Sequence, residues 1–176
     1  MRARVINIEP KKWLTDREPG IAVSKIAEVL AAFTPAPSPA VYQFRGPHQF
    51  FRARHGGRTT RIWGLNWWDD GTAIAAAYSR AEQFDSWLRN DEIANIVRNY
   101  WRENVAVSYN WSDMRDLWQI DLQDGMQLEG IYGLTAAQPE WAAVMTGKPS
   151  AAIFRGGHPQ VYLYVPDPFY VKPVKY

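Results

Sequence analysis

The spacing of apolar residues changes along this chain, and that change constrains the fold more than any other feature. One helical stripe lies within residues 21–33 and consists of Val23, Ile26, Ala27, Leu30 and Phe33. A second follows Asn90 or Asp91 and consists of Ile93, Ile96, Val97, Tyr100 and Trp101. From residue 105 onward the spacing approaches two, which predicts strands over 105–109, 117–122, 126–131, 151–154 and 161–165. Early helices followed by strands predict an α+β domain on a mixed or antiparallel sheet.

The segment between the two stripes contains a hinge, two strand candidates and a short helix. Three alternate prolines over 35–39 predict an extended hinge. Strands are expected over 41–45 and over 60–68, and Thr72 is expected to cap an alanine-rich helix after a turn at 69–71. With 176 residues the chain fits one compact domain, in which an N-terminal helical segment (1–40) precedes a core (41–176).

Composition excludes several classes of protein. There is no cysteine, which excludes disulfides, thiol catalysis and thiolate metal sites. The three histidines have no carboxylate at ligand spacing, so no metal site is expected. Twenty basic and eighteen acidic residues give a net charge of +2, so a basic partner surface has to be local. The sequence contains no apolar run that predicts a membrane span or a secretory signal, and the protein is expected to be soluble.

Two local signals stand out against this ordinary composition. Five arginines occur within seventeen residues that contain no acid: Arg45, Arg52, Arg54, Arg58 and Arg61. Arginine suits phosphate, and the nearby Gly46, Gly56 and Gly57 allow backbone amides to approach an anion, although a solvated loop explains the run equally well. Beside it, the rings of Trp63, Trp67 and Trp68 are expected either in the core or as a wall for a flat ring.

Three segments taken in order resemble the ADP-ribosyltransferase fold of bacterial toxin domains. The first is Val41-Tyr-Gln-Phe-Arg-Gly46, similar to the opening strand of those enzymes. The second runs from Trp63 through the alanine-rich helix to Tyr78 and Ser79, and the third runs from Gly156 to Pro166, followed by Phe169-Tyr-Val171. The resemblance spans about residues 41 to 174.

The resemblance implies that NAD is the substrate and that its nicotinamide bond is cleaved. It implies catalytic roles for Arg45, Tyr78 and Gln160, and NAD contacts from Arg45, Gly46, Trp63, Trp67, Trp68 and Tyr78. Gln160 stands where the family has its catalytic acid, so an amide would hold the ribose hydroxyl, or Glu129 or Glu140 would supply the acid.

The family's partners would be a protein or nucleic-acid acceptor and, for a toxin, a neutralising protein. Such a domain acts in the cytoplasm of the producing cell or of a target cell reached by secretion. Two other functions remain open. One is a module without enzymatic activity that grips single-stranded nucleic acid through arginine and tryptophan, and the other is an immunity-type protein that binds a partner.

Overall fold

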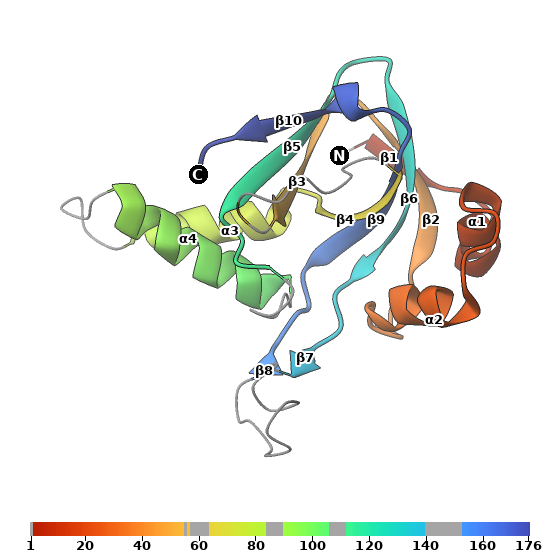
Figure 1. Cartoon of the computed structure of the whole chain (residues 1–176), viewed down its shortest axis with the longest axis horizontal. Helices are drawn as coiled ribbons and strands as arrows, with labels where there is room; N and C mark the ends of the chain where they lie inside the picture. The colour runs from red at the N-terminus through yellow and green to blue at the C-terminus, as the bar shows by residue number, and fades with distance from the viewer. Residues whose placement is uncertain (1, 55, 57–63, 84–89, 106–111, 140–152) are drawn as a thin grey trace.

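The computed structural model describes residues 2–54, 56, 64–83, 90–105, 112–139 and 153–176. Within these residues the chain is an α+β protein with four α-helices and an eight-stranded antiparallel sheet (Figure 1). The helices are α1 (Pro10–Arg17), α2 (Val23–Ala31), α3 (Thr72–Ala81) and α4 (Asn90–Asn104). The large sheet contains β1 (Arg2–Val5), β2 (Ala40–Arg45), β3 (His48–Arg54), β4 (Gly64–Asp69), β5 (Asp116–Leu122), β6 (Gln127–Leu134), β9 (Pro159–Val165) and β10 (Val171–Val174). A short pair is formed by β7 (Gln138–Pro139) and β8 (Ile153–Phe154), and a single 3₁₀ turn, η1 (Pro168–Tyr170), precedes β10.

Neighbouring strands of the large sheet come from distant parts of the chain. Their order is β1-β2-β6-β9-β4-β3-β5-β10, so β9 joins the two halves of the sheet by pairing with β6 on one side and β4 on the other. The edge strand β10 contains Pro173, which lacks an N–H and is tolerated at a sheet edge. The predicted antiparallel sheet is thereby confirmed, and the predicted strands over 117–122, 126–131 and 161–165 correspond to β5, β6 and β9.

Helices α1 and α2 pack on one half of the sheet. Trp13, Ile26 and Phe33 are buried with Val41 of β2 and Ile131 of β6 in one apolar cluster. The predicted stripe on 21–33 is confirmed at Ile26, Leu30 and Phe33, whereas Val23 and Ala27 are exposed. Because β1 pairs with β2 and the two helices share this core, the first forty residues pack as part of the same body as the sheet.

Helices α3 and α4 cover the other half. Val97 and Trp101 of α4 are buried against Ala73 and Ala77 of α3 in a second cluster, to which Ile93, Ile96 and Tyr100 contribute partly buried side chains. A third cluster, including Phe44, Phe50 and Trp68, fills the opposite face of the sheet. The two helix pairs therefore lie over separate halves of one curved sheet (Figure 1).

Two sequence expectations need correction. Thr72 is the first residue of α3, and Gly71 occupies the cap position with a φ of 94°, a conformation that glycine adopts without strain. The orphan amides at the start of α3 donate instead to Asp69 and Asp70. Part of the arginine run considered as a solvated loop is strand β3, which pairs along its whole length with β5.

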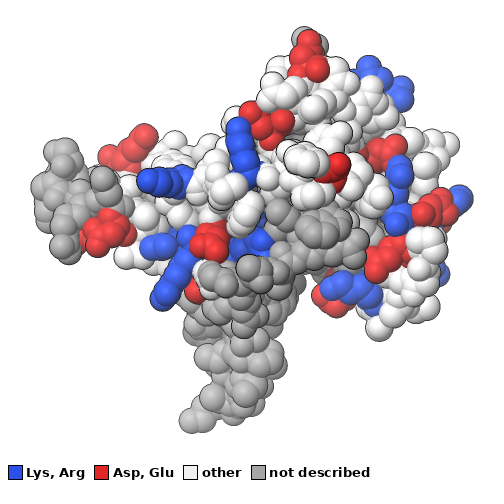
Figure 2. Space-filling model, turned by 45° about the horizontal axis from the view of Figure 1, so that its top comes forward, with Lys and Arg blue, Asp and Glu red and all other residues white. Residues whose placement is uncertain are grey.

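Some predicted segments lie outside the described residues, including 60–63 and 106–109 of two predicted strands. Charged side chains of both signs intermingle over the face in Figure 2, in keeping with the net charge of +2. No helix in the described part of the chain is both long and apolar enough to cross a membrane.

Candidate functional site

A pocket of about 630 Å³ lies between the two helix pairs, within the size range of small-molecule sites. Its floor is the place where β3 and β4 separate, since these strands are paired only at Phe51 and Asp69. Residues Lys25 and Glu28 of α2 line one side, and Trp101 of α4 lines another. The pocket thus takes one wall from each helix pair and its base from the centre of the sheet.

Arg52 of β3 brings a positive charge into this pocket. Its guanidinium donates a short hydrogen bond to Oδ1 of Asn66 and lies 6.0 Å from the ring of Trp68. Among the described residues no carboxylate forms an ion pair with it. Burial lowers the pKa of Arg52 to about 10, so the group is still charged at neutral pH. A partly buried arginine that faces a pocket without an acid partner is suited to receive an anion.

Asp69 and Gln160 form the polar centre of the wall. They stand opposite each other in the β4–β9 ladder, which puts their side chains on the same face of the sheet. Asp69 accepts hydrogen bonds from the amides of Gly71, Ala73 and Ile74 at 3.0, 3.2 and 2.7 Å. Burial nevertheless raises the pKa of Asp69 to about 7. The pocket therefore holds a neutral amide beside a carboxyl group that changes charge near neutral pH.

Aromatic rings supply much of the remaining lining. Trp67 packs with its ring centroid 5.2 Å from Phe33 and 4.7 Å from Tyr162, which fixes its orientation. Trp101 of α4 also lines the pocket, as does Trp68 of β4, whose ring packs in the cluster on the opposite face of the sheet; both are almost fully buried. A flat, partly apolar ligand would contact the partly exposed ring of Trp67.

The structure brings together three of the residues singled out in the sequence. Trp67, Trp68 and Gln160 all line the pocket. Trp63, Arg58, Arg61 and Glu140 lie outside the described residues.

Arg45 lies far from this group. It is exposed at the end of β2 opposite Gln127, whereas Gln160 is opposite Gly133, six residues further along β6. At about 3.4 Å per residue this separates the two positions by about 20 Å. The expected convergence of Arg45 and Gln160 on one nucleotide is therefore not formed, because β6 lies between their strands and pairs with each at a different end.

The packing of the chain explains why position 46 is a glycine. A Cβ atom at this position would lie 1.8 Å from the carbonyl oxygen of Gln123, so the turn between β2 and β3 packs directly on the backbone that follows β5. Its amide donates to the carbonyl of Met126 at 3.1 Å. Close packing of two turns accounts for the glycine, and it does not line the pocket.

Tyr78 is also outside the pocket lining. It lies near the end of α3, half-buried against the cluster shared with α4. Burial raises the pKa of its hydroxyl, as expected for a tyrosine packed in a scaffold. The prediction that Tyr78 meets Arg45 and Gln160 is accordingly not matched by its position.

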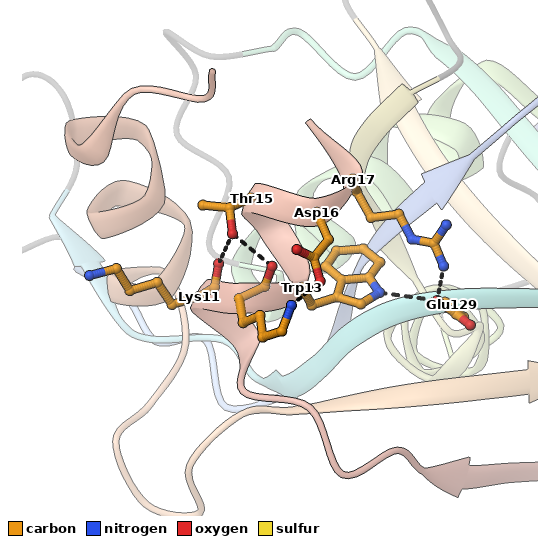
Figure 3. A network of polar contacts seen from close by, with 7 residues as sticks. Lys11, Trp13, Thr15, Asp16, Arg17 and Glu129 are labelled. Atoms are coloured by element: carbon orange, nitrogen blue, oxygen red, sulfur yellow. Dashed lines mark hydrogen bonds and ion pairs between the residues drawn. The ribbon is translucent and has the colours of Figure 1, made fainter. Parts of the chain in front are cut away.

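Glu129, considered as an alternative acid, is held by α1 (Figure 3). Its carboxylate forms a close ion pair with Arg17 and accepts a hydrogen bond of 3.2 Å from Nε1 of Trp13. Both donors project from α1 toward the same carboxylate of β6. This contact fastens the helix to the sheet and leaves Glu129 outside the pocket lining.

Sequence reasoning missed Arg52 and Asp69 as site residues. Arg52 was one of five arginines in a run, and nothing in the spacing ranks it above Arg45. In the sequence, Asp69 belongs to a predicted turn before a helix, and it does have that structural role.

A comparison of the chain with models of protein families, with curated proteins and with solved structures found no match.

The chemistry of the pocket follows from these groups alone. Among the described residues no three His, Asp or Glu side chains gather as a metal site. The pocket instead offers Arg52 for an anionic group, the ion pair of Lys25 and Glu28 on α2, an aromatic ring for a planar group, and an amide next to a carboxyl group.

Proposed function

We propose that the pocket between α2 and α4 binds NAD and that the chain cleaves the bond between nicotinamide and ribose, as an ADP-ribosyltransferase. The observation that carries this proposal is Arg52, an arginine of the pocket lining that lies near the ring of Trp68 and whose polar partner is a neutral amide. A dinucleotide pairs a pyrophosphate with flat rings, and it would supply the anion that Arg52 lacks.

In this proposal Arg52 takes the phosphate-binding role that the sequence resemblance gave to Arg45. The amide of Gln160 hydrogen-bonds a ribose hydroxyl, and the ionised carboxylate of Asp69 stabilises the positive charge that develops on the ribose. Nicotinamide leaves with the electron pair of the broken bond. Water or a protein or nucleic-acid acceptor then supplies the electron pair for the new bond to the ribose and loses a proton to solvent.

Binding and cleavage are tested separately. Calorimetric titration of the purified protein with NAD measures binding, and chromatography of the reaction mixture measures free nicotinamide. We expect Arg52→Ala to weaken NAD binding by about 2 kcal/mol, or roughly thirtyfold, the scale of a lost charge-assisted contact. Arg45→Ala is the matched control, since it removes the same charge at a position about 20 Å from Gln160 and outside the pocket lining, and it is expected to leave affinity unchanged.

Each outcome bears on a different part of the proposal. Equal losses in the two variants would remove the pocket assignment, because net charge alone would then explain both. Binding of NAD without release of nicotinamide, with every acceptor class supplied, would leave a nucleotide-binding module and overturn the enzyme. Absence of NAD binding would overturn both.

A further inference from the structure

A second group of arginines lies on β1 and β2, at the edge of the sheet and on the face against which α1 packs. Gln43 of β2 stands opposite Arg4 of β1, and its Oε1 accepts hydrogen bonds from Nε of Arg4 at 2.9 Å and from Nη2 of Arg45 at 3.5 Å. One neutral amide oxygen therefore bridges two exposed guanidinium groups. Arg2 stands opposite Arg45 in the same ladder, so a third arginine residue occupies this corner of the sheet.

In the part of the chain that the structure describes, no acid balances the guanidinium groups of Arg4 and Arg45. The carboxylate nearest in the ladder is Glu129, opposite Gln43 on β6, and it is already engaged by Arg17 and Trp13. Among the described residues neither Arg4 nor Arg45 forms an ion pair with a carboxylate. This corner therefore carries a local positive charge although the chain as a whole is nearly neutral.

The composition of the face indicates the chemistry of its partner. Arg4, Gln43, Arg45 and Gln127 are polar and lie on adjacent strands, so these four side chains offer neither the dry centre of a protein interface nor an apolar group that could insert into a lipid layer. Arginine forks match phosphate oxygens in pairs. Side chains on the same face of a strand repeat about every 7 Å, which provides a row of donors for an extended chain of phosphates.

We propose that this face of β1 and β2 binds the phosphodiester backbone of nucleic acid, through Arg4 and Arg45 held by Gln43. The inference does not rest on the function proposed for the pocket. The contact is with phosphates, so it is independent of base sequence and sensitive to salt.

Gln43→Glu is the sharpest test. The change preserves the shape of the side chain and places a carboxylate between the two guanidinium groups, where it forms ion pairs and cancels their charge for an outside anion. The control is Gln83→Glu in the turn after α3, because Gln83 also accepts a hydrogen bond from an arginine, Arg80, and the change in net charge is the same. Binding of a labelled single-stranded DNA oligonucleotide is followed by fluorescence anisotropy over a range of salt concentrations.

We expect the parent and Gln83→Glu to bind equally, and Gln43→Glu to bind about tenfold more weakly at low salt. The double variant Arg4→Ala/Arg45→Ala should lose a similar factor and lower the slope of log affinity against log salt by about 1.4, or about 0.7 for each phosphate contact. Thermal melting of each variant shows whether the fold is kept.

Three results would overturn the proposal. The first is no binding of the parent at low salt, and the second is equal weakening by Gln43→Glu and Gln83→Glu, which would indicate a general charge effect. The third is tighter binding to vesicles of anionic phospholipid than to DNA with the same response to the variants, which would identify a membrane headgroup surface. Failure here leaves NAD binding by the pocket untouched, and the reverse also holds.

Discussion

Gln160 and Asp69 stand directly opposite each other in the β9–β4 ladder, so an amide and a carboxyl group lie side by side on the pocket wall. Two carboxylates in these positions would repel each other and share a proton. With an amide at 160, the charge of this wall depends on Asp69 alone. Gln160 therefore supplies hydrogen bonds at any pH, whereas Asp69 supplies a charge that depends on pH.

Replacing Gln160 by alanine is expected to slow nicotinamide release by about 10²- to 10³-fold with NAD affinity little changed. That is the scale of one lost hydrogen bond that strengthens in the transition state. Gln119→Ala is a suitable control, since Gln119 is also a buried amide of the sheet but does not line the pocket. An unchanged release rate in Gln160→Ala would remove this residue from the proposed reaction.

Asp69 predicts a dependence of stability on pH. Its pKa is raised from 3.8 to about 7 by burial, so between these values the folded chain holds a proton that the unfolded chain has lost. The resulting stabilisation is fully present below about pH 4 and is lost as the pH rises to about 7. Across this window the unfolding free energy of the parent should fall by on the order of 4 kcal/mol relative to that of Asp69→Asn, whose side chain is neutral throughout. Urea unfolding of both proteins between pH 4 and pH 8 measures the difference, and a constant difference would contradict the raised pKa.

The sequence predicted elements wherever burial follows a regular period. Helices α2 and α4 and strands β5, β6 and β9 place apolar residues at the spacing of their own geometry. Helix α1 was not predicted, because only Trp13 and Leu14 are buried in it and two residues are too few to form an apolar stripe. Strand β3 was not predicted, because the charged residues Arg52 and Arg54 occupy positions where alternation would place apolar residues.

The site was only partly readable for a different reason. Trp67, Trp68 and Gln160 lie on β4 and β9, whose adjacency brings them together. Arg45 and Gln160 were expected to meet, but which strands pair and in which register depends on contacts between distant parts of the chain. The placement of β6 between β2 and β9 carries no local signature in the sequence, and it is this placement that separates the two residues.

Glu129 is expected to hold α1 on the sheet and to take no part in cleavage of the nicotinamide bond. Glu129→Gln keeps an oxygen that accepts from Nε1 of Trp13 and loses only the charge opposite Arg17, a partly exposed pair. We expect a loss of about 1 kcal/mol or less in unfolding free energy and an unchanged rate of nicotinamide release. Trp13→Ala, which removes a buried ring from the same contact, should cost about 3 to 5 kcal/mol. A folded Glu129→Gln protein that no longer releases nicotinamide would instead identify Glu129 as the acid of the reaction.

A substitution at Gly46 tests whether this glycine is needed for packing or for binding NAD. Gly46→Ala introduces a methyl group 1.8 Å from the carbonyl oxygen of Gln123, and because the obstacle is backbone, one of the two turns has to move. We expect a loss of about 3 kcal/mol in unfolding free energy, at the upper end of the cost of overpacking. The fraction that stays folded should bind NAD with the affinity of the parent, since the turn is not part of the pocket lining. Chemical unfolding and calorimetry on the same preparation measure the two quantities. Normal stability combined with weakened NAD binding would place the nucleotide at this turn and not between α2 and α4.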